Sequence, residues 1–142
     1  MEDLYGRRLA TATFASYASP GYLEAHQDSL DEMVWLNWDD GLDTPSWPAS
    51  APDIPDKMCR LRSDSVSSLL EAARLGVDAT ILPCFIGERD PGLERITPNQ
   101  IVSRRDIWLL VRADLRRVRR IRTFLDFFVR YIKTQRAVIE SI

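Results

Sequence analysis

The sequence predicts a single α/β domain whose mixed sheet is at least partly parallel and is flanked by helices. A strand predicted at residues 58–62 leads into a helix-start signal, and a nearly unbroken apolar run follows that helix. Strand, helix and strand with short connections form a βαβ unit, which requires the two strands to run parallel. A long amphipathic helix is predicted near the end of the chain, and 142 residues suffice for one compact domain but not for two ordinary ones.

The first third of the chain alternates extended and helical signals. Residues 8–18 predict an extended segment, and Ser19-Pro20 followed by Glu24 predicts a short helix that ends near His26. The apolar run at 33–38 is typical of a buried strand. Residues 39–56 contain four prolines and therefore predict a long irregular loop of the kind that often serves as a lid or binding loop.

The remaining elements follow from apolar spacing. Val66, Leu69, Leu70 and Ala73 recur at helical intervals after the capping residues 63–65, and Gly76 marks the end of that helix. Residues 77–85 predict a strand buried on both faces, and shorter strands are expected at 93–96 and 107–111. The last helix is predicted over residues 116–136 from an apolar stripe: Val118, Ile121, Leu125, Phe128 and Ile132.

Composition excludes several classes of protein. The net charge of −2 argues against a surface that grips nucleic acid, and the arginines between 112 and 122 are better explained as a solvated helix face. No apolar run approaches the roughly 20 residues of a membrane span, and no signal peptide is visible at the acidic N-terminus. We therefore expect a cytoplasmic protein that makes no contact with membranes.

The residues needed for chemistry are scarce. Two cysteines and one histidine do not make a disulfide framework or a metal centre, and no catalytic set or phosphate loop is present. Cys59 and Cys84 lie among apolar neighbours and are expected to be core residues that are reduced and unreactive. We predict that the chain is not an enzyme and uses no cofactor or metal. An enzyme using Cys84 or Asp64 is the disfavoured alternative.

Several segments, in order along the chain, resemble the effector-binding domain of LysR-type transcription regulators. These segments are Tyr17-Ala18-Ser19-Pro20-Gly21-Tyr22-Leu23, the helix ending Ala72-Ala73-Arg74-Leu75-Gly76, then Ile81-Leu82-Pro83, Pro91-Gly92-Leu93-Glu94-Arg95-Ile96, Ile107-Trp108-Leu109-Leu110-Val111 and Phe124-Leu125-Asp126-Phe127. One departure is Asp78, which stands where the family usually has a second glycine. Aspartate tolerates a left-handed backbone, and we expect it to add a carboxylate to the edge of the cleft.

The resemblance implies a periplasmic-binding-protein-like fold of type 2, with a mostly parallel mixed sheet and an incomplete first lobe. Residues 1–142 would form one effector-binding fragment, with the second lobe at about 8–100 and the return strand and C-terminal helix at about 101–142. It also implies a small-molecule effector, homo-oligomer formation, and contact with DNA only through a winged-helix domain that this sequence lacks. A stand-alone solute-binding protein of the same fold is the alternative.

Candidate site residues follow from the predicted fold, in which ligands bind where strands end and helices begin. The effector-binding candidates are Asn37, Trp38, Asp39, Ser63, Asp64, Ser65, Pro83, Cys84 and Phe85. Helix capping equally explains the two serines, and core packing is favoured for Trp38 and Phe85. Three tryptophans, Trp35, Trp38 and Trp47, could instead form a stacking platform. The candidates for an oligomer interface are Ile121, Phe124, Leu125, Phe128 and Ile132.

Overall fold

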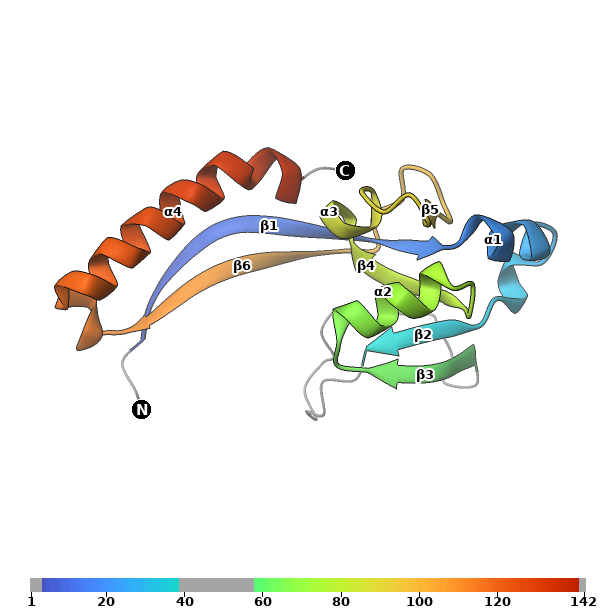
Figure 1. Cartoon of the computed structure of the whole chain (residues 1–142), viewed down its shortest axis with the longest axis horizontal. Coiled ribbons are helices and arrows are strands. Elements are labelled where there is room, and N and C mark those ends of the chain that lie inside the picture. The colour runs from blue at the N-terminus through green and yellow to red at the C-terminus, as the bar shows by residue number, and fades with distance from the viewer. Residues whose placement is uncertain (1–3, 39–57, 141–142) are drawn as a thin grey trace.

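Two long antiparallel strands connect the parts of the molecule. β1 (Leu4–Ala18) pairs with β6 (Ser103–Arg112) from Leu4 opposite Arg112 to Phe14 opposite Ser103, with a bulge between Arg8 and Ala10. The computed structural model describes residues 4–38 and 58–140. Figure 1 shows the two strands leaving a lobe of helices and short strands as a curved ribbon, with helix α4 running alongside. We call this ribbon, residues 4–13 and 103–112, the arm.

The rest of the sheet belongs to the lobe. The inner half of β1 pairs antiparallel with β4 (Ala79–Pro83) and with β5 (Glu94–Arg95). β2 (Trp35–Trp38) lies between β3 (Cys59–Ser63) and β4 and runs parallel to both. Within the described residues the order is β3-β2-β4-β1-β5, with β6 also paired to β1. The sheet is therefore mixed, as predicted, but it is not mostly parallel. Its parallel pairing is confined to β2, β3 and β4, and β1 pairs antiparallel with β4, β5 and β6.

The short helices begin and end where the sequence predicts. α1 (Pro20–His26) is capped by the Ser19 hydroxyl, which accepts a hydrogen bond from the Tyr22 N–H. A 3₁₀ turn, η1 (Leu30–Glu32), leads from α1 to β2. α2 (Val66–Arg74) is capped in the same way by Ser65, and Gly76 follows it with a φ of 73°. A left-handed φ is open to glycine at no steric cost, which explains the sharp end of α2.

The strand predicted at 77–85 is shorter than expected, because Cys84 and Phe85 belong to a helical turn. β4 ends at Pro83, and α3 (Cys84–Gly87) begins at the next residue. The last pair between β1 and β4 joins Phe14 to Pro83, and β2 has already ended at Trp38. From Cys84 onward the backbone hydrogen bonds are those of a helical turn, such as the bond from the Glu88 N–H to the Cys84 carbonyl at 2.9 Å.

Side chains on both faces of the sheet are buried. One face carries Tyr17, Leu36, Trp38 and Leu82, which pack with Leu69 and Ala73 of α2. The other face carries Phe14 and Ile81, against which Phe85, Ile107 and Ile139 pack. All five residues of β4 are buried, as the unbroken apolar run predicts for a strand covered on both faces.

Helix α4 (Arg119–Ile139) begins three residues later than predicted, after a 3₁₀ turn, η3 (Leu115–Arg117). Val118 precedes it without a side-chain cap, so no capping residue in the sequence marks the start. Ile121, Leu125, Phe128 and Ile132 are half-buried, whereas Phe124 lies on the flank with 58% of its surface exposed. No described helix is long and apolar enough to cross a membrane.

Candidate functional site

The three parallel strands end side by side at one edge of the lobe. Trp38 at the end of β2 is paired with Ser63 at the end of β3, and Pro83 ends β4 on the other side of β2. In Figure 1 β2 and β3 both point toward the side of the lobe nearer α4. The backbone of the fold therefore brings together the candidates from all three segments, although Asp39 lies outside the described residues.

Ser63 and Ser65 are occupied by local hydrogen bonds at this edge. The Ser63 hydroxyl oxygen accepts a hydrogen bond from the Ser65 N–H at 3.1 Å, and the Ser65 oxygen accepts one from the Ser68 N–H at 3.3 Å. Asp64 lies between them with an exposed side chain. The capping role of Ser65 is thus confirmed, and neither hydroxyl donates a hydrogen bond to a residue that the structure describes.

Trp38 and Asn37 form the inner wall of the same edge. Trp38 is only 6% exposed, and its indole N–H donates to the Ile81 carbonyl at 3.1 Å. Asn37 is also buried, and its side-chain oxygen accepts a hydrogen bond from the Trp38 N–H at 2.8 Å. The core role favoured for Trp38 is confirmed. Trp35 is half-buried and Trp47 lies outside the described residues, so no stacking platform is assembled from the described tryptophans.

Cys84 belongs to a polar network, reaching from the core to the surface, that the sequence did not reveal. The Tyr17 hydroxyl donates to the Glu88 carboxylate at 2.9 Å, and the Arg95 guanidinium donates to the same carboxylate and approaches the Cys84 sulfur at 3.6 Å. Burial, together with hydrogen bonds to Cys84 and Glu88, raises the pKa of Tyr17 well above its usual range. Tyr17 lies about 70 residues before Glu88 and Arg95 in the sequence, so no local pattern links it to them.

Pro83, Phe85 and the two cysteines differ in burial. Pro83 is buried, and Phe85 is half-buried against the cluster formed by Phe14 and Ile81, as expected for a packing role. Cys84 is fully buried. Cys59 is only half-buried, because β3 is the last strand on its side of the sheet. The expectation that both cysteines are core residues is therefore wrong for Cys59.

Asp78 does not lie where the sequence suggested. It immediately precedes β4, at the opposite edge from the ends of the parallel strands, and it is only 1% exposed. Its carboxylate lies 3.1 Å from the Arg60 guanidinium and 3.5 Å from the Tyr22 hydroxyl. Burial raises the pKa of Asp78, while Arg60, Tyr22 and His26 lower it. Asp78 has no left-handed backbone and adds no carboxylate to the ligand-facing edge, so both expectations are corrected.

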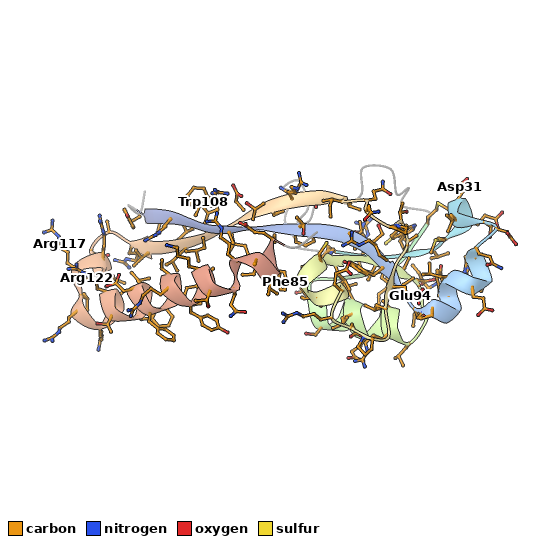
Figure 2. All side chains as sticks on the ribbon, turned by 90° about the horizontal axis from the view of Figure 1, so that it is seen from above. Asp31, Phe85, Glu94, Trp108, Arg117 and Arg122 are labelled. Carbon is orange, nitrogen blue, oxygen red and sulfur yellow. The ribbon has the colours of Figure 1, made fainter. Side chains whose placement is uncertain are left out.

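A groove of about 540 Å³ separates α4 from the arm. Its residues come from β1, β6, η3 and α4: Tyr5, Arg7, Leu109, Val111, Arg116, Arg117, Arg122, Leu125, Asp126 and Val129. Figure 2 shows Arg117 and Arg122 at the end of the arm far from the lobe, with Trp108 on the other side of the arm from α4. From the sequence, Arg116, Arg117 and Arg122 are expected only on a solvated helix face, whereas in the structure all three line this groove. Across residues 4–38 and 58–140 no three His, Cys, Asp or Glu side chains are grouped to hold a metal ion.

Solved structures with this architecture are regulatory domains of bacterial transcription regulators. The CrgA regulatory domain from Neisseria meningitidis, a LysR-type transcriptional regulator, matches with a TM-score of 0.70 at 21% identity, over 91% of this chain and 69% of that domain. The AphB regulatory domain from Vibrio vulnificus matches with a TM-score of 0.66 at 20% identity, over 92% of this chain and 71% of that one. The effector domain of AmpR from Pseudomonas aeruginosa matches with a TM-score of 0.68 at 17% identity, over 94% of this chain and 66% of that domain.

These matches extend over nearly the whole chain but not over the whole of the larger proteins. Against full-length AphB from Vibrio cholerae, described as a member of the LTTR family, the match covers 92% of this chain and 49% of that one, with a TM-score of 0.69. No protein-family model matches the sequence, and no curated protein matches it either. The structural likeness, at these levels of identity, establishes the fold: this chain has the architecture of a LysR-type regulatory domain, which is periplasmic-binding-protein-like.

Proposed function

We propose that this chain is the effector-sensing domain of a LysR-type transcription regulator and that it binds a small molecule without transforming it. The observation that carries the proposal is the match of more than nine-tenths of the chain to regulatory domains. The function further implies a non-catalytic, cytoplasmic protein that needs no cofactor and reaches DNA only through a separate winged-helix domain.

The effector site proposed here lies at the ends of the parallel strands. The hydroxyl protons of Ser63 and Ser65, beside the N-terminus of α2, supply donors to a polar group of the ligand. Asp64 is exposed beside them and would repel a carboxylate, so the group it faces is neutral or cationic. Asn37, Trp38, Pro83, Cys84 and Phe85 would shape this edge, and Asp39 remains a predicted contact.

Sensing follows from the way ligands select conformations. An effector that binds one arrangement of the lobe and arm more tightly than another shifts the equilibrium toward it by that difference in affinity. β1 and β6 join the lobe to the arm through a long ladder of pairs with one bulge, so a change at the lobe can be transmitted along them. In an intact regulator, such a shift would alter the spacing of the DNA-binding domains.

A thermal-shift screen against a metabolite library tests this proposal. A ligand at 100 times its Kd should stabilise the fold by about 2.7 kcal/mol. The Asp64→Asn variant should change the affinity of the hit at least severalfold. Glu71→Gln removes the same charge from an exposed position further along α2 and should leave the affinity unchanged. Hits that respond to neither variant would contradict the proposed site, and a library without any stabilising ligand would contradict the function.

A stand-alone solute-binding protein of the same fold is the second candidate. It is less favoured because the similar structures described above are regulatory or effector domains and a full-length regulator. The two functions differ in genetic context: a regulator requires a winged-helix segment in the same reading frame or assembly, whereas a solute-binding protein requires a transporter. Sequencing the surrounding locus separates the two.

We also propose that α4 contributes to an interface between copies of the chain. The contact residues expected from the sequence are Ile121, Phe124, Leu125, Phe128 and Ile132. Of these only Phe124 is exposed, and the other four are half-buried, so the proposal rests on Phe124 and its exposed neighbours. Phe124, Phe127 and Tyr131 are each more than half exposed on the flank of this helix. Phe124 stacks on Phe128 with centroids 5.8 Å apart, so the flank presents a contiguous aromatic surface. Exposed patches of this kind commonly mark protein contacts.

A further inference from the structure

The groove between α4 and the arm, hereafter the α4 groove, is chemically distinct from the proposed effector edge. From this groove we infer a second site, which binds a small organic anion with a phosphate or carboxylate head on an apolar body. Four of the residues that line it are arginines, Arg7, Arg116, Arg117 and Arg122, against one carboxylate, Asp126. Its volume of about 540 Å³ lies within the usual range for small-molecule pockets.

Three cations of the α4 groove have no anionic partner among the residues that the structure describes. Among the described residues, no carboxylate forms an ion pair with Arg7, Arg117 or Arg122, although other arginines of the arm do find one. Arg116 instead lies over the Tyr5 ring, with its guanidinium carbon 3.9 Å from the ring centroid. This contact holds one guanidinium against an aromatic wall while its N–H groups remain available to a ligand.

The start of α4 adds to the unbalanced positive potential. Its first turn contains no acidic residue and no side-chain cap, and it carries Arg119, Arg120 and Arg122 instead. The N-terminus of a helix already has a partial positive charge, so three cations there repel the helix dipole and one another. Such a cluster of cations destabilises the start of its own helix, and an arrangement of this kind is expected where a bound anion supplies the missing negative charge. An anion bound between Arg117 and Arg122 would supply it.

The remaining wall defines the rest of the ligand. Leu109 and Val111 from β6 face Leu125 and Val129 from α4 across the groove. Arginines are suited to a planar or tetrahedral oxyanion, which they bind through paired hydrogen bonds, whereas these aliphatic side chains gain from covering an apolar group. The combination therefore favours an anion attached to a ring or chain over inorganic phosphate.

Titration with phenyl phosphate, benzoate and inorganic phosphate, followed by two-dimensional NMR of the whole chain, tests this inference. At least one ring-bearing anion should bind about tenfold or more tightly than inorganic phosphate, because burying an aromatic ring is worth at least that factor. The largest chemical-shift changes should fall on residues of the α4 groove. Arg117→Gln and Arg122→Gln should each weaken binding by about tenfold, as expected for a lost charged hydrogen bond.

Arg130→Gln is the matched control, because Arg130 is an exposed arginine of the same helix that does not line the groove. It should change affinity less than about twofold, the order expected when no contact with the ligand is lost. Equal losses in all three variants would mean non-specific attraction and would overturn the inference. The inference would also fail if neither ring-bearing anion bound more tightly than inorganic phosphate, or if the chemical-shift changes clustered at Ser63–Ser65. Binding of duplex DNA to the groove, with no binding of the small anions, would contradict it as well. A hit of the effector screen that binds the α4 groove is distinguished by its response to Arg117→Gln and its lack of response to Asp64→Asn.

Discussion

Tyr17 fills space that only a glycine at position 87 leaves open. A Cβ at Gly87 would lie 2.6 Å from the ring carbons Cε1 and Cε2 of Tyr17, which is 1% exposed and cannot move aside. Gly87→Ala is therefore expected to lower the free energy of unfolding by about 1–3 kcal/mol, the usual cost of overpacking. Chemical denaturation measures this cost.

Gly21→Ala provides the control for that substitution. Gly21 lies within α1, and nothing lies within 4 Å of a Cβ placed there. Alanine favours a helix over glycine, so this variant should gain up to about 1 kcal/mol. If Gly87→Ala proved as stable as Gly21→Ala, the contact between α3 and the Tyr17 ring would not exist in solution.

Asp78 makes stability depend on pH in an unusual direction. Burial raises the pKa of its carboxyl, so the folded state holds this proton more tightly than the unfolded chain does. Stability from this group is therefore greatest below its unfolded pKa of about 3.9 and is lost as pH rises through the folded value. Asp78→Asn should remove this loss, so the variant should gain stability relative to the parent as the pH rises from about 4 to 7.

Denaturation curves of parent and variant across that pH range show whether the stability difference between them changes with pH in the expected direction. The comparison between the two proteins matters because Asp106 and Glu140 act in the opposite direction. Hydrogen bonds from Thr11 and from Arg136 respectively lower the pKa of these two carboxyls, and both are present in each protein. If the difference in unfolding free energy between parent and variant did not change with pH, the Asp78 carboxyl would not have the raised pKa that its burial beside Arg60 implies.

Single residues also show how far local sequence reasoning extends. Ser19, Ser65 and Gly76 were identified correctly because capping and left-handed turns depend on a few neighbouring positions. Asp78 was misplaced because its partner, Arg60, lies on another strand. The network around Tyr17 escaped notice for the same reason, since Glu88 and Arg95 meet it only through the folded sheet.

At the scale of elements, α4 shows the limit of periodicity. The spacing of apolar residues predicted the helix, but it could not decide which flank of the stripe the arm covers. Leu125 is half-buried against the arm, whereas Phe124, its neighbour in sequence, is exposed. The width of the arm decides which side chains of α4 are buried, because an arm of two strands is too narrow to cover the full apolar stripe.

The two residues give a paired test of the proposed interface. Phe124→Asp should leave the fold of the single chain intact, since its ring is already exposed, but it should weaken association between copies. Leu125→Asp should instead destabilise the chain itself by about 2 kcal/mol or more, because a charge replaces a packed side chain. Sedimentation velocity and chemical denaturation separate the two effects. Unchanged association of Phe124→Asp would show that the aromatic flank of α4 is not the interface.

At the scale of the whole molecule, burial is distributed unevenly between the lobe and the arm. Every residue of β4 is buried, whereas no residue of α4 is. The β6 side chains that point away from α4 are exposed, including Trp108 at 55% and Leu110 at 57%. The sequence predicted the parallel strands of the lobe because the βαβ unit is local. It did not predict the long pairing of the arm, because β1 and β6 lie almost a hundred residues apart.

This unequal burial predicts a gradient of local stability along the molecule. Amides of β4 and of the inner half of β1 should exchange with solvent only through global unfolding, since their elements pack on both faces. Amides in the first two turns of α4 should exchange through a much smaller opening, because unpaired arginines and a missing cap weaken that end. The C-terminal turn should be better protected, since Ile139 packs on the sheet and the Thr11 N–H donates to the Glu140 carboxylate at 3.1 Å. Native-state hydrogen exchange should therefore show protection rising along α4 from Arg119 to Ile139. Uniform protection equal to that of β4 would mean that the helix unfolds only with the lobe, as one cooperative unit.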